Sequence, residues 1–233
     1  IRIANTPASF EPTLDYIVTK VARFPFDKFS DASNKLGTQM KATGEVMSIG
    51  RTMEESLLKA VRSLETGVCH IYHKKFDKWS NDDLLAYIKG GTDDRLYAIG
   101  QLIRNGVDLA LIYDKTKIDM FFLEKFKNIV EFENVVRAHP MDVETLRAAK
   151  RMGFSDKYIG QLWGLSQNEM YRLREKNNVF PVYKMIDTCA SEFASYVPYF
   201  YSTYEEENES IVSGKEKIIV LGSGPIRIGQ GVE

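Results

Sequence analysis

One pattern in residues 80–178 constrains the fold more than any other feature of the sequence: a capping residue followed by a short run of helical periodicity, several times over. Helix starts are expected at Ser80, Thr92, Thr116, Asp142, Ser155 and Ser166. The second of these helices is expected to stop at Gly106. No convincing alternation of apolar and polar residues occurs here, so the sequence predicts an all-helical unit with its own core.

Short β segments precede this helical unit. Residues 14–21 and 44–49 are rich in β-branched and aromatic residues, which predicts two strands. A helix follows the second strand, with Thr52 as its cap, Glu55 completing a capping box and Gly67 as its stop. The fold class is therefore predicted as mainly α, a helical domain flanked by α/β pieces.

The last part of the chain has β character of another kind. Residues 217–221 are an apolar run that predicts a buried parallel strand, and a glycine-rich loop follows at 222–231. The glycine spacing is not that of the dinucleotide fingerprint, because the third glycine comes too late. Since the chain begins with Ile1 and stops just after this loop, we expect an internal fragment with one complete middle domain and parts of two others.

Net charge and cysteine content bear on the binding partners and the cellular compartment of the chain. The chain has 31 Lys and Arg against 32 Asp and Glu, a net charge of −1 that gives no overall attraction to nucleic acid or anionic membranes. No apolar run approaches the roughly 18 residues of a spanning helix. The two cysteines lie far apart, which predicts a reducing compartment and a cytoplasmic location.

Residues 155–176 have the spacing of a helix-turn-helix motif, with Gly164 at the turn. The residues that would then face a major groove are Gln167, Asn168, Tyr171 and Arg172. Residues 142–176 hold seven Lys and Arg against five Asp and Glu, a small excess for a DNA-binding unit. Any two short helices packed at a steep angle need the same small residues. A structural helix pair is favoured, and a helix-turn-helix DNA-binding regulator is the alternative.

Cys69, His70 and His73 have metal-ligand spacing, but no second cluster completes a set of four ligands. Cys189 and the serines have no recognisable base partner for nucleophilic catalysis. The sequence therefore predicts neither a metal site nor a catalytic residue in this chain.

Several collinear stretches resemble the large subunit of carbamoyl-phosphate synthase. They are residues 6–12, 14–20, 39–52, 181–184, 187–190 with 192–193, 201–205 and 224–231. The matches are long and keep their order along the chain, and the helical middle is similar more loosely. The resemblance is therefore specific.

The resemblance implies three parts. In this family, two homologous ATP-grasp halves flank a helical oligomerisation domain. Residues 1–68 would be the C-terminal part of the carboxyphosphate half, and residues 69–214 the oligomerisation domain with its exit segment. Residues 215–233 would be the first strand and glycine loop of the carbamoyl-phosphate half. Within that loop, Gly229, Gln230 and Gly231 would line the interior tunnel between the two active sites.

The resemblance also implies an activity for the complete enzyme, a carbon–nitrogen ligase. It makes carbamoyl phosphate from bicarbonate, ammonia released from glutamine, and two ATP, for arginine and pyrimidine biosynthesis. The implied cofactors are MgATP, with Mg²⁺ or Mn²⁺, and potassium. The implied partners are a glutaminase small subunit and further copies of the chain, bound through the helical domain, with no nucleic acid and no membrane. The family's catalytic and cofactor ligands match no position of this sequence, so no activity is expected of the segment alone.

Overall fold

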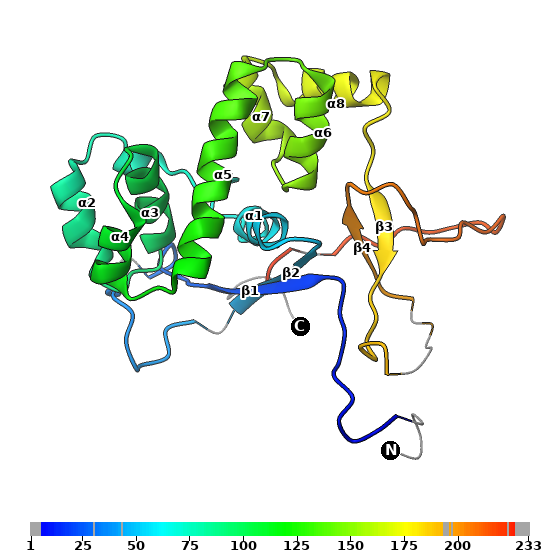
Figure 1. Ribbon diagram of the computed structural model, residues 1–233, viewed down its shortest axis with the longest axis horizontal. Helices are drawn as coiled ribbons and strands as arrows, with labels where there is room; N and C mark the ends of the chain where they lie inside the picture. The colour runs from blue at the N-terminus through cyan, green and yellow to red at the C-terminus, as the bar shows by residue number, and fades with distance from the viewer. Residues whose placement is uncertain are drawn as a thin grey trace.

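The computed structural model describes residues 6–29, 31–42, 44–192, 196, 198–222 and 224–226. Over these residues, eight α-helices accompany two separate two-stranded sheets, and the helices stand on one side of the first sheet (Figure 1). This confirms the predicted mainly-α class with small β-containing flanks. No helix in the described part of the chain is long and apolar enough to cross a lipid bilayer.

The first sheet pairs β1 (Ile17–Arg23) with β2 (Gly44–Gly50) in antiparallel register, with Val21 opposite Val46. β1 begins three residues later than the sequence predicted. The reason is that Ile17 pairs with Gly50, and the chain then turns into a helix, so no residues remain to pair with residues 14–16. On the outer face of the sheet, Met47 and other apolar side chains are exposed.

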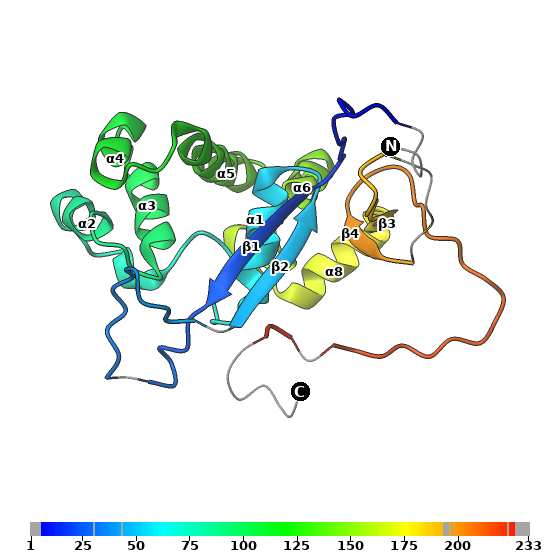
Figure 2. The same cartoon turned by 90° about the horizontal axis from the view of Figure 1, so that it is seen from below.

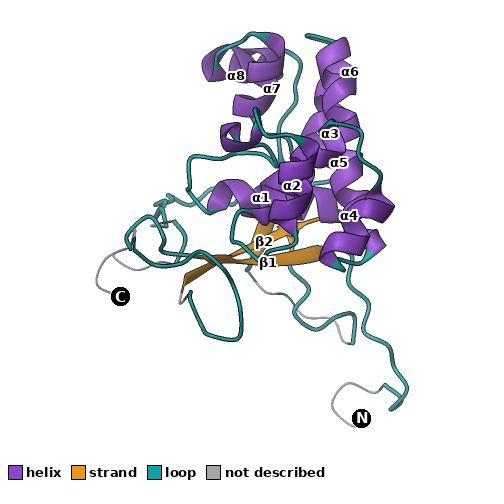
Figure 3. Cartoon of the chain, turned by 90° about the vertical axis from the view of Figure 1, so that its left-hand side faces the viewer, coloured by secondary structure: helices purple, strands orange, loops and turns teal. Residues whose placement is uncertain are grey.

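Helix α1 (Met53–Ser63) lies across the inner face of this sheet, with the other helices above it (Figure 3). Thr52 caps it as predicted, accepting the Glu55 N–H at 3.2 Å. The capping box is not closed in the predicted way, because the Glu55 carboxylate accepts the N–H of Arg51 instead. The helix also ends before Gly67, and Glu65 follows it in the left-handed conformation, with φ of 52°.

Helix α1 contributes to both apolar clusters of the chain. Ala60 and Leu64 pack with Val46 of the sheet, whereas the opposite side of the helix enters the main helical core with Leu58 and Val61. The helix therefore joins the β segment to the helical unit.

The main core lies among seven further helices. They are α2 (Asn81–Ile88), α3 (Arg95–Arg104), α4 (Leu109–Thr116), α5 (Met120–Ala138), α6 (Val143–Arg151), α7 (Asp156–Trp163) and α8 (Gln167–Lys176). Helix α5 is the longest and contacts α1, α3, α4, α6 and α7. It separates α2–α4 from α6–α8 (Figure 1). A single 3₁₀ turn, η1 (Lys74–Phe76), precedes α2.

Four of the six predicted helix starts are confirmed by a side chain that accepts a backbone N–H of the first turn. They are Ser80, Asp142, Ser155 and Ser166, the last as a complete capping box. These signals are local, and local hydrogen bonds are enough to realise them.

Two predicted starts are wrong. Thr92 forms an antiparallel bridge with Lys35 instead, so α3 begins only at Arg95. Thr116 ends α4, a helix that the sequence analysis missed, and Asp119 caps α5 in its place. Helix α4 was missed because it is short and only Ile112 is fully buried, which leaves a weak apolar periodicity.

A second antiparallel pair, β3 (Val182–Met185) and β4 (Phe200–Thr203), lies beside the first sheet. The acidic segment after β4, residues 205–209, covers the other edge of β3. Glu209 donates its N–H to the Tyr183 carbonyl oxygen, and its carboxylate accepts the N–H of Met185 at 2.6 Å. These bonds extend the pair without adding a strand.

The buried parallel strand predicted at residues 217–221 is wrong. This segment follows the edge of the molecule without strand pairing (Figure 2), and Ile218, Ile219, Val220 and Leu221 are 83–94% exposed. A parallel strand needs hydrogen-bonded neighbours. The described strands are engaged in their own antiparallel pairs, so none serves as a parallel partner for this run.

Gly153 sets the closest approach between the helical unit and α1. Its φ is +92°, and a Cβ there would lie 2.8 Å from the Glu55 Cα. Gly67 has nearly the same backbone conformation, with φ of +83°, but a Cβ there would meet nothing within 4 Å. Substitutions at the two glycines therefore distinguish the cost of the backbone conformation from the cost of a steric overlap.

We predict that Gly153→Ala lowers the free energy of unfolding by about 1–3 kcal/mol more than Gly67→Ala does. Both substitutions incur a left-handed backbone penalty of about 1–2 kcal/mol, and only Gly153→Ala adds an overlap with α1. Equilibrium unfolding in urea measures both values. Equal losses of unfolding free energy would show that α1 and the turn at Gly153 can move apart at little cost.

Candidate functional site

The predicted tunnel residues, Gly229, Gln230 and Gly231, lie outside the described residues, and their role stays a prediction. The described part of the same loop contacts the β segment. The Glu45 N–H donates to the Ile226 carbonyl oxygen at 2.9 Å. Gly224 has φ of +96°, and a Cβ there would lie 2.9 Å from a carboxylate oxygen of Glu65.

The structure separates the two histidines that have metal-ligand spacing. His70 is buried, with Nε2 3.0 Å from Glu133 Oε1. His73 instead caps η1, accepting the Lys75 N–H at Nδ1. Among the described residues, no group of three or more His, Cys, Asp and Glu side chains is placed to hold a metal ion.

His70 belongs to a buried ionic cluster with Glu133 and Arg104. Arg104 Nε donates to Glu133 Oε2 at 2.8 Å, and its NH2 group donates to both Oε1 and the Ile71 carbonyl oxygen. Burial by itself would raise the pKa of Glu133. The hydrogen bonds from His70 and Arg104 outweigh it and hold that pKa below its usual value. Glu133 is therefore ionised, and His70 Nε2 must carry the proton it donates.

The surroundings of His70 favour its neutral form. Burial lowers the pKa of His70 more than the hydrogen bond to Glu133 raises it. The ring stacks on Tyr158 with a centroid distance of 3.7 Å, and Nδ1 is buried without a hydrogen-bond partner. A proton on Nδ1 would therefore have no acceptor.

Sequence reasoning missed Glu133 as a functional residue, although one signal was present. It stands four residues after Ile129 and three before Val136 on α5, so it occupies a position of the apolar face. A carboxylate at such a position must find buried partners. The sequence does not reveal that they come from α3 and from His70, which is 63 residues away.

We predict that acidification destabilises the chain partly through His70. Unfolded histidine has a pKa near 6.5, and the folded pKa is lower, so the unfolded state binds more protons below about pH 6.5. The free energy of unfolding should therefore fall as the pH drops from about 6.5 towards the folded pKa, by at most about 1.4 kcal/mol per pH unit from this group.

His70→Gln removes this titration and can retain an N–H donor towards Glu133. Denaturant unfolding between pH 7.5 and pH 5 should show a smaller pH dependence for the variant than for the unmodified chain. If the unfolding free energies of the two proteins have the same pH dependence, the assignment of this effect to His70 is wrong.

The predicted helix-turn-helix pair is present as two packed helices, α7 and α8. Gly164 makes the turn with φ of +71°, and a Cβ at Gly160 would lie 2.5 Å from the Leu165 carbonyl oxygen. Gln167, Asn168, Tyr171 and Arg172 are exposed. Two of the seven basic residues, Lys150 and Arg174, instead pair with Asp156 inside the unit. The charge available for DNA is therefore smaller than the sequence count indicates.

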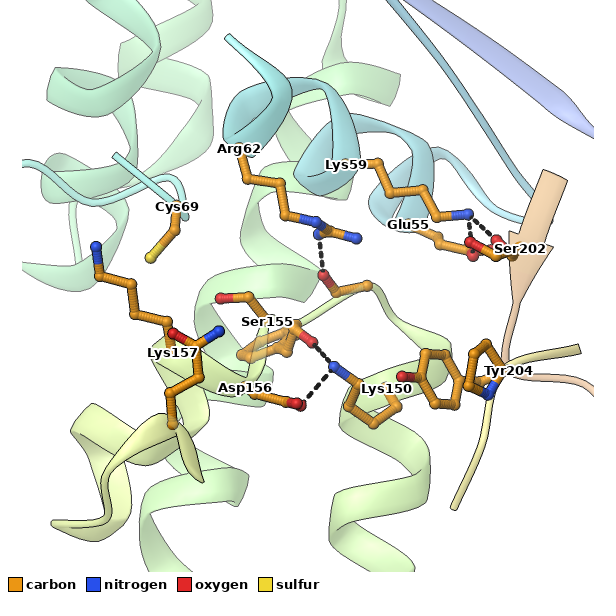
Figure 4. A pocket seen from close by; sticks show the side chains of 14 residues that line it. Glu55, Lys59, Arg62, Cys69, Lys150, Ser155, Asp156, Lys157, Ser202 and Tyr204 are labelled. Carbon is orange, nitrogen blue, oxygen red and sulfur yellow. Dashed lines mark hydrogen bonds and ion pairs between the residues drawn. The ribbon is translucent and has the colours of Figure 1, made fainter. Parts of the chain in front are cut away.

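A cationic cavity of about 400 Å³ lies where α1, the start of α7 and β4 meet (Figure 4). Its basic lining residues are Lys59, Arg62, Lys150 and Lys157. Its acidic lining residues are Glu55 and Asp156. Sequence analysis did not predict this cavity, because its lining comes from segments up to about 150 residues apart.

Exposed apolar side chains flank the connection between α4 and α5. They are those of Leu111, Tyr113, Phe121 and Phe122, which are 40–51% exposed. The two phenylalanine rings meet edge to face, with centroids 5.4 Å apart. We name these four residues the α4–α5 patch. Large apolar side chains gathered on a surface are typical of protein interfaces.

Exposed apolar surface on the helical unit and on the β segments is of the kind found at interaction sites. A family model described as the oligomerisation domain of the carbamoyl-phosphate synthetase large chain matches residues 45–178. Because the match covers more than half of the sequence, this chain belongs to that family. The resemblance found in the sequence is thereby confirmed: the chain is a segment of the large chain of a ligase.

Proposed function

We propose that this chain is the assembly segment of a carbamoyl-phosphate synthase large subunit and brings copies of that subunit together through its helical domain. The observation that carries the proposal is the family match over residues 45–178, combined with the α4–α5 patch inside the matched region. The division into residues 1–68, 69–214 and 215–233 belongs to the same proposal.

In this proposal the complete enzyme makes carbamoyl phosphate from bicarbonate, glutamine-derived ammonia and two ATP, for arginine and pyrimidine biosynthesis. MgATP, with Mg²⁺ or Mn²⁺, and potassium bind in its ATP-grasp halves, and a glutaminase small subunit supplies ammonia in the cytoplasm. In this proposal the segment positions the catalytic parts of the enzyme and supplies no group that takes part in the reaction.

Two apolar surfaces support the idea that the flanks belong to larger units. The outer face of the first sheet exposes Val18 and Met47, and the run at residues 218–221 is almost fully exposed. Surfaces of this kind are costly to leave in water. Further polypeptide of the two ATP-grasp halves would cover them.

A homo-oligomer through the α4–α5 patch makes a specific prediction. Replacing Phe121 by Glu places a charge in the interface and removes apolar area worth about 1.5–3 kcal/mol. We expect the self-association constant to fall at least about tenfold. Sedimentation velocity over a concentration series measures it.

Tyr171→Glu on α8 is the matched control. Tyr171 is 50% exposed against 51% for Phe121, and each ring has a basic side chain above it, at 5.5 Å and 5.3 Å respectively. Self-association should be unchanged in this control. A monomeric unmodified chain at high concentration would contradict oligomerisation, and equal effects of the two substitutions would contradict the patch.

The tunnel role of Gly229, Gln230 and Gly231 also has a direct test in the intact enzyme. Gly231→Phe should leave bicarbonate-dependent ATP hydrolysis and ATP synthesis from carbamoyl phosphate largely intact, while overall carbamoyl phosphate formation falls far below either. A bulky side chain would block passage without touching either active site. If Gly231→Ala damages ATP synthesis as much as Gly231→Phe, the position is structural and the tunnel role is wrong.

A further inference from the structure

The cationic cavity has more positive than negative charge in its lining. Four basic side chains and two acidic ones give a formal charge of +2. Burial lowers the pKa of Lys150 to about 8, partly offset by Asp156, so most of this amine is still charged at pH 7. An excess of cations around a partly enclosed space favours occupation by an anion.

Both carboxylates of the cavity are already engaged with other groups. Glu55 accepts the Arg51 N–H with one oxygen and pairs with Lys59 through the other, at 2.8 Å. Asp156 accepts from Lys150 with Oδ1 and from Arg174 with Oδ2, at 2.9 and 2.8 Å. Each carboxylate therefore has an ion-pair partner other than Arg62.

Arg62 is one of two lining cations that these carboxylates leave without an ion pair. Its NH1 group donates to the Gly153 carbonyl oxygen at 2.7 Å, and no carboxylate oxygen of the described residues lies within 4.0 Å of it. Figure 4 shows the Arg62 side chain reaching from α1, with a dashed line that marks its hydrogen bond. Guanidinium groups carry five N–H donors, so Arg62 retains donors for a ligand.

Three further donors border the same space. Ser155 caps α7 by accepting the Tyr158 N–H, which leaves the N–H groups of Asp156 and Lys157 without acceptors among the described residues. The amine of Lys157 is likewise unpaired within the described part of the chain, and its side chain is exposed. The N-terminal end of a helix favours negative charge.

We propose that this cavity is a binding site for a small oxyanion, either free phosphate or the phosphate group of a small metabolite, held by Arg62, Lys157 and the N-terminal N–H groups of α7. Its volume of about 400 Å³ falls at the small end of ligand cavities, which leaves room beyond the phosphate group itself. None of the lining residues belongs to the α4–α5 patch.

Calorimetric titration of the chain with inorganic phosphate, at constant ionic strength maintained with sodium chloride, tests the proposal. Saturable one-to-one binding is expected. Arg62→Gln should weaken it at least about tenfold, because a charge-assisted hydrogen bond contributes about 1.5–3 kcal/mol. Arg172→Gln removes an exposed arginine on α8 and should leave binding unchanged. Phenyl phosphate in a second arm distinguishes the sources, since tighter binding than phosphate indicates a phosphorylated metabolite and equal binding indicates free phosphate.

Cys69 reports whether the anion binds in this cavity, because it belongs to the lining. In a Cys189→Ser background it is the single thiol, and its alkylation by neutral iodoacetamide should slow at least about fivefold as phosphate saturates. Lys157→Gln, at an exposed position, should weaken this protection even if Arg62→Gln fails to fold. Unchanged alkylation at saturating phosphate, absence of binding, or full binding by both variants would overturn the proposal.

Discussion

The structure depends on one helix that must pack on two sides. α1 presents Ala60 and Leu64 to the first sheet and Leu58 to the helical core, so neither unit can complete its apolar packing without it. Its backbone at Glu55 also receives the turn at Gly153 at a distance that leaves no room for a side chain. A displacement of α1 would therefore disturb both cores at once, and this couples the β segment mechanically to the helical unit.

Buried charge follows a common rule in two clusters of this chain: one carboxylate has two donors from different segments. Glu133 receives His70 and Arg104, and Asp156 receives Lys150 and Arg174. Two donors per carboxylate offset the cost of desolvation. The same rule leaves more cations than anions near α1, and this surplus is the physical origin of the proposed oxyanion site.

The family membership and the exposed surfaces together describe a connecting segment. The helical unit and α1 share one buried core, whereas the outer face of the first sheet and residues 218–221 expose apolar side chains. The proposed α4–α5 interface lies away from these flanking segments along the chain.

The sequence by itself determined the features that depend on neighbouring residues. Ser80, Asp142, Ser155 and Ser166 cap the expected helices, because a cap needs only a side-chain oxygen and an N–H two or three residues away. The mainly-α class followed from the same local patterns.

Tertiary structure decided what depends on distant partners. Thr92 bridges to Lys35 instead of capping a helix, and residues 217–221 stay unpaired although their composition is that of a buried strand. The pairing of His70 with Glu133, and the surplus charge around Arg62, arise from segments that only folding brings together. Periodicity within one segment carries no information about which other segment its side chains will meet.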